Sequence, residues 1–165
     1  RSAAMTAAQL IAYLDEAPAD ADRPLTTELD VARLVARGLS VSIVRRLTSA
    51  DPADGGLTPD EVERLLIPRR TLTKRRAGRQ RLTLEESNRA ARLARVLAVA
   101  AETFGADPAD RRSADSREAT RRAALWLRRP QHALDGEVPL DLCTTDAGAR
   151  LVEDALGRIA HGVFA

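Results

Sequence analysis

Basic side chains concentrate in one stretch of the chain. From Arg64 to Leu84 there is no acidic residue, and this stretch contains the only lysine, Lys74. Arginine side chains neutralise phosphates and form paired hydrogen bonds with guanine edges, although a charge run is usually only a solvated face. The candidate DNA-binding residues are Arg69, Arg70, Thr71, Thr73, Lys74, Arg75, Arg76 and Arg79.

Residues that could perform catalysis do not form a recognisable set. His132, Cys143 and His161 are too scattered for a metal-ligand set, and neither C-x-x-C nor H-E-x-x-H occurs. The carboxylate pairs at 60–61 and 85–86 stand at predicted helix starts, where they complement the helix dipole. We therefore predict a protein that is not an enzyme and that uses no metal and no cofactor.

Clear helix signals surround the basic stretch. Thr58 followed by Pro59 predicts a helix start, and Pro68 begins a second helix that Gly78 ends. We expect Leu72 to anchor this second helix in the core. A helix, a tight turn and a basic helix form the layout of a helix-turn-helix DNA reader. This placement favours DNA binding over a merely solvated face.

Further helices are predicted on both sides of this pair. Thr26 or Thr27 opens a helix that Gly38 ends. The run Thr83–Glu86 is a capping box, and the helix that it opens should be the longest of the chain, reaching about Phe104. No comparable strand pattern occurs, so we predict an all-α fold.

The chain after this long helix begins with a polar loop at 105–117. Asp115 or Ser116 should then cap a helix that ends after Leu127, with Trp126 as a core residue. We expect the loop to be a surface insertion with no role in the core.

An amphipathic helix is predicted near the C-terminus: Thr144, Thr145 or Asp146 can cap its start, and Gly162 ends it. Two interpretations of the following Phe164 are open: it folds back onto its own helix, or it enters a partner together with the terminal carboxylate. The predicted apolar face comprises Ala147, Leu151, Val152, Ala155, Leu156 and Ile159.

Composition limits the remaining possibilities. The 165 residues suffice for one domain or two small ones, and the formal net charge is +2. The single cysteine excludes an internal disulfide and suits a reducing cytosol, and no apolar run is long enough to span a membrane. We expect a cytoplasmic protein with a short helix at residues 6–14 and a linker at 17–24.

Residues in the C-terminal half resemble a known family. Trp126-Leu127, Pro139-Leu140, Gly148-Ala149, Leu156–Ile159 and His161–Phe164 resemble the toxin-binding domain of the Xre/MbcA/ParS antitoxins. The stretch PDEVERLLIPRRTLTKRRAGR resembles the Xre-type helix-turn-helix that precedes this domain, although Ile67-Pro68 replaces the expected turn glycine. The resemblance covers roughly residues 58–165. Its departures are Gln131, Asp135 and Cys143.

The resemblance implies an organisation and a function. It implies an Xre-like helix-turn-helix domain, which we place at 26–82, and a small helical toxin-binding domain with a C-terminal plug at 83–165. Composition, rather than the resemblance, predicts an N-terminal arm and linker at 1–25. The implied partner is a RES-domain toxin that consumes NAD or uses it for ADP-ribosylation, and the antitoxin's C-terminal segment occludes its active site. The implied toxin-binding residues are Arg158, His161, Gly162, Val163, Phe164 and Ala165.

Operator DNA and a second copy of the chain are further expected partners, because helix-turn-helix proteins commonly read paired half-sites. Autorepression of its own operon would follow from such binding. The alternative is a helix-turn-helix transcriptional regulator with a helical oligomerisation domain and no toxin partner.

Overall fold

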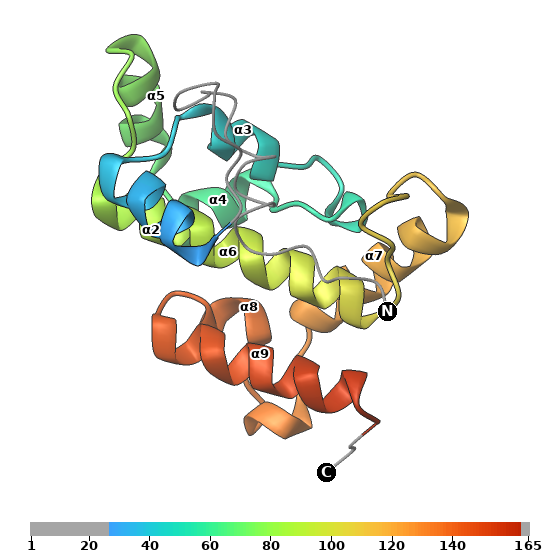
Figure 1. Cartoon of the computed structure of the whole chain (residues 1–165). Helices are drawn as coiled ribbons and strands as arrows, with labels where there is room; N and C mark the ends of the chain where they lie inside the picture. The colour runs from blue at the N-terminus through green and yellow to red at the C-terminus, as the bar shows by residue number, and fades with distance from the viewer. Residues whose placement is uncertain (1–26, 163–165) are drawn as a thin grey trace. The chain divides into compact units, whose positions relative to one another are not determined.

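The computed structural model describes residues 27–162. The predicted helix at 6–14, the linker at 17–24 and residues 163–165 of the predicted plug lie outside this range. Within it, all regular structure is helical apart from one isolated bridge between Thr48 and Leu57, which confirms the all-α class (Figure 1). No helix in this range is long and apolar enough to cross a membrane.

The described chain divides into two compact units. The N-terminal unit contains residues 27–50 and 57–94, and the C-terminal unit contains 51–56 and 95–162. The helices of the N-terminal unit are α2 (Glu28–Arg37), α3 (Ser42–Leu47), α4 (Pro59–Leu65), α5 (Arg69–Ala77) and the first half of α6 (Leu84–Thr103).

Threonine caps begin three of these helices. Thr27, Thr58 and Thr83 each accept a hydrogen bond from the backbone N–H three residues later. In each case the carboxylate of that later residue accepts from the threonine's own N–H. The reciprocal pairs satisfy N–H groups that a first helical turn leaves without partners, so the predicted starts near 27, 58 and 83 are confirmed.

The core of the N-terminal unit joins segments distant in sequence. Leu39 is fully buried, and its N–H donates to the Ser87 hydroxyl on α6 at 2.9 Å. The Leu39 carbonyl accepts from the N–H of Leu82 at 3.0 Å. Gly38 has a φ of 89°, and a Cβ there would meet the Leu82 carbonyl oxygen. Only glycine combines this dihedral with such a close backbone approach.

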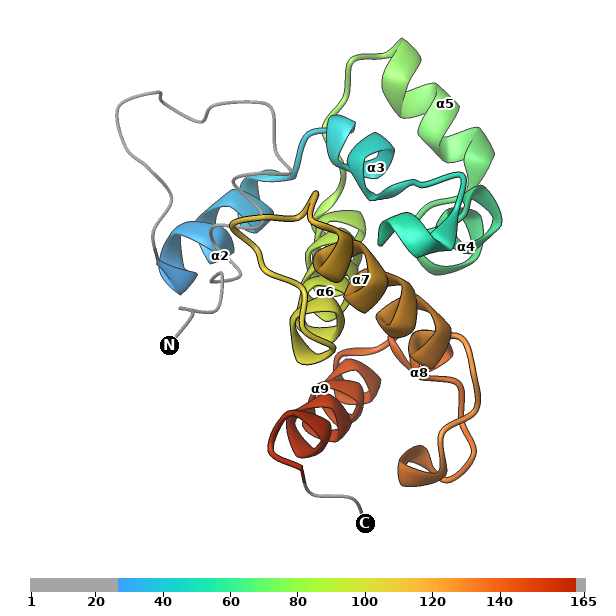
Figure 2. The same ribbon diagram turned by 90° about the vertical axis from the view of Figure 1, so that its right-hand side faces the viewer.

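Helix α5 lies at the outer edge of the N-terminal unit in both ribbon views (Figures 1 and 2). None of its residues is buried. The expectation that Leu72 anchors it in the core is therefore wrong: this side chain is only half-buried. The fully buried leucine and isoleucine of the preceding turn, Leu66 and Ile67, occupy the core instead.

The C-terminal unit contains the second half of α6, a single-turn helix η1 and four further helical segments. Helix α7 contacts η1 and α8, and α9 contacts α8 and η2. Helix α8 is a short element that sequence analysis did not predict. The segments are η1 (Pro52–Asp54), α7 (Ala114–Leu127), η2 (His132–Leu134), α8 (Pro139–Leu142) and α9 (Asp146–Ala160).

The start of α7 differs from the prediction. Its cap is Ser113, which accepts from the N–H of Ser116, rather than Asp115 or Ser116. Ser116 is instead buried inside the helix, and its hydroxyl accepts from the N–H of Asp107 at 2.9 Å. The loop before α7 is thus tied to the helix by a partly buried hydrogen bond. Trp126 is half-buried rather than fully buried, with its ring centroid 6.3 Å from that of Phe104.

The buried face of α9 is rotated from the predicted one. Val152, Ala155 and Leu156 are buried as expected, but Leu151 is 54% exposed and Ala147 is exposed as well. The remaining buried positions are Gly148 and Ala149. A Cβ at residue 148 would fall on the Leu142 carbonyl oxygen, so the absence of a side chain allows the start of α9 to lie against the backbone at the end of α8.

Two glycines of α9 should therefore respond oppositely to alanine. Gly148→Ala forces a methyl group onto backbone atoms, and we expect a loss of about 1–3 kcal/mol in the free energy of unfolding. Gly157→Ala in the same helix meets no atom within 4 Å. It should stabilise the protein by up to about 1 kcal/mol, because alanine loses less entropy in a helix. Urea unfolding followed by circular dichroism measures both, and equal effects would contradict this account.

Candidate functional site

Helices α4 and α5 form the predicted helix-turn-helix. The N–H groups of Leu66 and Ile67 both donate to the carbonyl of Val62, at 2.9 and 3.0 Å, which ends α4 tightly. Ile67 is 1% exposed, and Pro68 precedes the first residue of α5. Buried apolar side chains thus hold the turn where the sequence lacks the expected glycine.

The candidate DNA-binding residues on and after α5 are exposed except for two. Thr71 is half-buried, and the side chain of Arg75 is 24% exposed. Arg69 lies 3.9 Å from Asp60 and 3.7 Å from Glu63, but such exposed pairs contribute little to stability and are easily exchanged. The helix therefore presents most of its basic side chains to solvent.

Arg75 holds α5 against the start of α6. Its Nε and Nη2 atoms donate to the two carboxylate oxygens of Glu86, each at 3.2 Å. Its Nη1 atom donates to Gln80 at 3.1 Å, and the N–H of Thr83 donates to Glu86 at 2.8 Å. A bidentate pair between arginine and a buried carboxylate fixes both groups in orientation. Arg75 thus positions the helix, a function that sequence analysis did not assign to it.

The pKa of Glu86 reflects these contacts. Burial of Glu86 raises its pKa. The backbone hydrogen bond from Thr83, together with the hydrogen bond and positive charge of Arg75, lowers the pKa by more than burial raises it. The net result is a pKa below the ordinary value of 4.5. The carboxylate therefore stays charged at neutral pH although Glu86 is only 8% exposed.

A cleft lies beside the C-terminal end of α5. Its lining comes from the end of α5, from the residues that follow α5, and from the segment that leads into α3. This last segment contributes Ser40, Val41, Ser42 and Arg45. Sequence analysis missed these residues, because they are distant in sequence and only the packing of Leu39 against Leu82 brings the two segments together. The adjacent basic pair at 45–46 was the one available signal.

The C-terminal end of α9 and the two residues after it carry the described part of the predicted toxin-binding site. Arg158, His161 and Gly162 are exposed, and Gly162 has a φ of 69°, which suits the predicted helix stop. Val163, Phe164 and Ala165 lie outside the described residues.

One face of α9 is open to solvent along its length. Leu151 is the exposed apolar residue of this face, and Leu125 on α7 is a second exposed leucine of the C-terminal unit. Glu153 accepts a hydrogen bond from Nε of Arg95 at 2.6 Å, which ties α9 to the second half of α6. The exposed positions of α9 are Asp146, Ala147, Arg150, Leu151, Asp154, Arg158 and Ala160.

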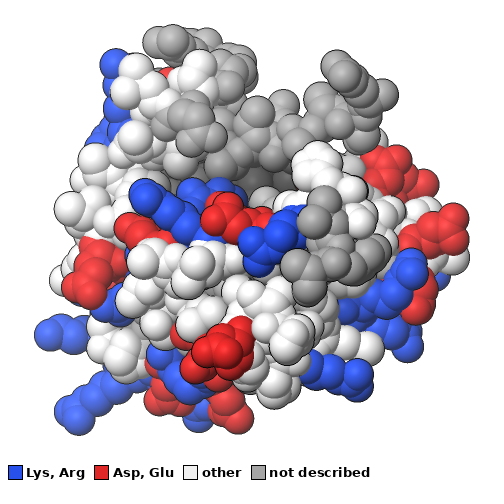
Figure 3. Space-filling view, turned by 90° about the horizontal axis from the view of Figure 1, so that it is seen from below, with Lys and Arg blue, Asp and Glu red and all other residues white. Residues whose placement is uncertain are grey.

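Side chains capable of holding a metal do not cluster. Between residues 27 and 162, no group of three His, Cys, Asp or Glu side chains could hold a metal ion. Cys143 is buried, and its thiol donates to the Pro139 carbonyl at 3.4 Å. The face drawn in Figure 3 intersperses acidic and basic side chains.

Two family models match the chain. Residues 30–95 match the antitoxin Xre-like helix-turn-helix domain. Residues 100–162 match the antitoxin Xre/MbcA/ParS C-terminal toxin-binding domain. The first match covers α4 and α5, and the second covers α7 through α9.

Curated relatives carry similar names. The chain is 39% identical over 98 residues to an antitoxin Xre of Yersinia enterocolitica, covering 59% of this chain and 58% of that protein. It is 32% identical over 138 residues to an antitoxin Xre of Pseudomonas putida, covering 84% and 76%. It is 28% identical over 137 residues to a Prs ADP-ribosylating antitoxin of Sphingobium sp., covering 83% and 82%.

Removing the charge of Glu86 should loosen α5. We expect Glu86→Gln to lower the free energy of unfolding at neutral pH by about 1–3 kcal/mol, because Arg75 loses its charged acceptor. Since folding lowers the pKa of Glu86, its contribution is present above the ordinary value of 4.5 and is lost as the pH falls through the lowered folded value.

The difference between wild type and Glu86→Gln should therefore shrink in acid, which urea unfolding at neutral and acid pH measures. The matched control is Glu85→Gln, because Glu85 is 77% exposed and pairs with Arg89 at the surface. An equal effect of both substitutions at neutral pH would refute a special contribution of Glu86.

Proposed function

We propose, because this chain belongs to the Xre family of antitoxins, that it neutralises a cognate toxin through its C-terminal unit and binds operator DNA through α4 and α5. It acts by binding and catalyses no reaction of its own. The observation that carries the proposal is that the toxin-binding family model matches the segment whose last helix presents an exposed face.

The proposed partner is a RES-domain toxin that uses NAD. The name of the Sphingobium relative, a Prs ADP-ribosylating antitoxin, supports a partner with ADP-ribosyl chemistry, for which NAD is the usual donor. Binding would leave the toxin folded but exclude its substrate, which accounts for neutralisation without any catalytic group on the antitoxin.

The segment at the end of α9 enters the toxin's active site in this proposal. Arg158 and His161 are exposed on the last turns of α9, next to Val163 and Phe164 in sequence. Arginine and aromatic side chains supply most of the binding energy in many protein interfaces. Leu151 and Leu125 extend the contact along the C-terminal unit, because exposed leucines gain free energy when a partner covers them.

Operator binding is proposed from the exposure and charge of α5. Its exposed arginines and Lys74 stand on the second helix of the motif, which is the helix that enters the major groove in helix-turn-helix proteins. A homodimer is the corresponding assembly, since paired half-sites require two copies. Repression of the protein's own operon follows from this binding.

Shortening the chain tests the neutralisation mechanism. A chain ending at Gly162 should no longer inhibit NAD consumption by the RES-domain protein encoded beside it, while its unfolding transition stays unchanged. Phe164→Ala should weaken inhibition by about 2 kcal/mol, or roughly thirtyfold, if this ring is a binding hot spot.

Leu84→Ala serves as the control for this test, because Leu84 is an exposed leucine of the N-terminal unit and should not affect inhibition. Full inhibition by the chain ending at Gly162 would move the inhibitory contact to the body of the C-terminal unit. If neither the wild-type chain nor any variant bound or inhibited the toxin, the proposal would be wrong. The chain would then be interpreted as a helix-turn-helix regulator without a toxin partner.

Two side chains of α5 test DNA binding. Arg70→Ala combined with Lys74→Ala should reduce affinity for a duplex from the upstream region of the operon and reduce its preference over unrelated sequence. Removing one side chain that reads a base should lower discrimination by about 1–3 kcal/mol. Electrophoretic mobility shifts measure both effects, and toxin inhibition should be unchanged. Wild-type affinity in the double variant would contradict base reading by α5.

A further inference from the structure

The cleft beside α5 is a hollow on the surface of the described N-terminal unit, and its lining is strongly basic. It has a volume of about 780 Å³. No acidic residue is among the described residues that line it, in contrast to the mixed face of Figure 3. Its lining residues are Ser40, Val41, Ser42, Arg45, Arg75, Arg76, Arg79, Gln80 and Arg81.

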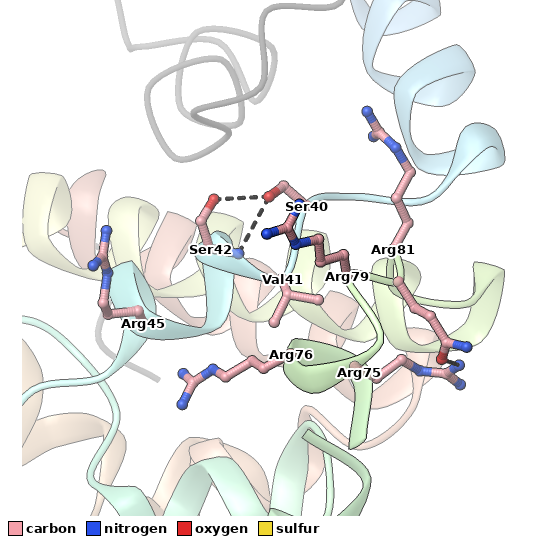
Figure 4. A pocket seen from close by; sticks show the side chains of 9 residues that line it. Ser40, Val41, Ser42, Arg45, Arg75, Arg76, Arg79 and Arg81 are labelled. Carbon is pink, nitrogen blue, oxygen red and sulfur yellow. Dashed lines mark hydrogen bonds between the residues drawn. The ribbon is translucent and has the colours of Figure 1, made fainter. Parts of the chain in front are cut away.

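The arginines around the cleft differ in what they contact (Figure 4). Arg75 is engaged with Glu86 and Gln80, and Arg81 donates to the Gly38 carbonyl at 2.8 Å. Arg79 instead extends toward Ser40, and Arg76 extends below Val41 toward the side on which Arg45 lies. Neither makes an ion pair within the described residues 27–162. The end of α5 and the residue two positions beyond it therefore each bring one guanidinium group to this cleft.

The opposite wall contributes a third cation and two hydroxyl groups. Arg45 is exposed on α3 and borders the cleft. The hydroxyls of Ser40 and Ser42 lie 2.9 Å apart, and the Ser40 hydroxyl also accepts from the Ser42 N–H. Each hydroxyl keeps further hydrogen-bonding capacity.

The chemistry of this set selects a phosphate. Arg76 and Arg79 make no ion pair within residues 27–162, and positive side chains that share one concave surface repel each other unless an anion lies between them. The guanidinium group matches the geometry of phosphate oxygens and donates two parallel hydrogen bonds to them. Serine hydroxyls are frequent donors to phosphate oxygens as well.

We infer that this cleft binds phosphates of the DNA backbone, through Arg45, Arg76 and Arg79, beside the groove that α5 enters. The inference rests on the DNA binding proposed above and assigns a part of that interface to α3. DNA is the occupant favoured by position, because the cleft begins at the last turn of the proposed recognition helix. Contacts of this kind set register and orientation and carry no sequence information.

The two groups of basic residues should therefore behave differently. The exposed side chains along α5 determine which sequence is bound, and the cleft determines how strongly any duplex is bound. Phosphate contacts release counterions, so log affinity falls against log salt concentration with a slope of about −0.9 per phosphate contacted.

The test combines Arg45→Gln, Arg76→Gln and Arg79→Gln in the full chain. Binding is measured by fluorescence anisotropy, with labelled duplexes of the upstream region and of unrelated mixed sequence, from about 50 to 200 mM salt. We expect affinity for both duplexes to fall about tenfold or more and the salt slope to shrink by about 0.9 for each phosphate that the variant no longer binds. The ratio between the two duplexes should stay unchanged.

Two control variants isolate the cleft from net charge and from folding. Arg112→Gln, Arg117→Gln and Arg122→Gln together remove the same charge from exposed positions of the C-terminal unit and should leave the slope unchanged. Lysine at 45, 76 and 79 keeps the charge and should retain most of the slope. Circular dichroism establishes that each variant is folded.

The outcomes separate this inference from the proposed function. In one outcome, wild type binds DNA and the Arg70→Ala, Lys74→Ala double variant binds it more weakly, but the cleft variant keeps the wild-type salt slope. That result overturns the cleft assignment and leaves the proposed operator binding in place. If wild type binds no duplex, both are overturned. In the last outcome, inorganic phosphate at constant ionic strength raises the unfolding temperature of wild type but not of the cleft variant, and the two proteins bind each duplex with equal affinity. The occupant of the cleft is then free phosphate and not DNA.

Discussion

A buried carboxylate joins the most polar helix of this protein to its core. Helix α5 has no buried residue, so apolar packing along its own length does not determine its direction. Glu86 provides this constraint, because it accepts hydrogen bonds from Arg75 on one side and from Thr83 at the start of α6 on the other. The same carboxylate thus completes a helix cap and holds a guanidinium group. The DNA contacts proposed for α5 and for the cleft depend on this connection.

Close backbone approaches determine the shape of each unit. In the N-terminal unit, Gly38 allows the chain after α2 to contact the segment around Leu82, which brings α3 beside the end of α5. In the C-terminal unit, Gly148 allows α9 to lie against the carbonyl of Leu142. Both contacts are between backbone atoms, where a single methyl group is too large. The candidate surfaces are therefore consequences of small residues that belong to neither surface.

Local signals made most of the helices predictable from the sequence. The caps at Thr58 and Thr83 are decided by hydrogen bonds within one helical turn, so the residue types alone predict them. The same residue types place the starts at Thr27 and Thr145 to within one or two residues. The cap of α7 was misplaced because three candidates stand within four residues, and the choice of Ser113 depends on the burial of Ser116 against the preceding loop.

The parts that were mispredicted depend on tertiary packing. Leu72 and Leu151 fit an amphipathic pattern, but neither has an apolar partner that buries it fully. The α5 half of the candidate DNA site could be predicted, because its charges are contiguous in sequence. Ser40, Ser42 and Arg45 could not be, since their proximity to Arg76 and Arg79 exists only in the folded chain.

The lack of burial along α5 has an evolutionary consequence. Proteins tolerate substitutions as long as folding stability stays above a threshold, and substitutions at buried positions cause most of the large losses of stability. Polar substitutions on α5 leave the core untouched, so mutation can explore many side-chain combinations there without loss of the folded state. Arg75 is the exception, since its loss strands a buried carboxylate. Duplicated copies of such a gene can therefore diverge in what α5 recognises while retaining the same scaffold.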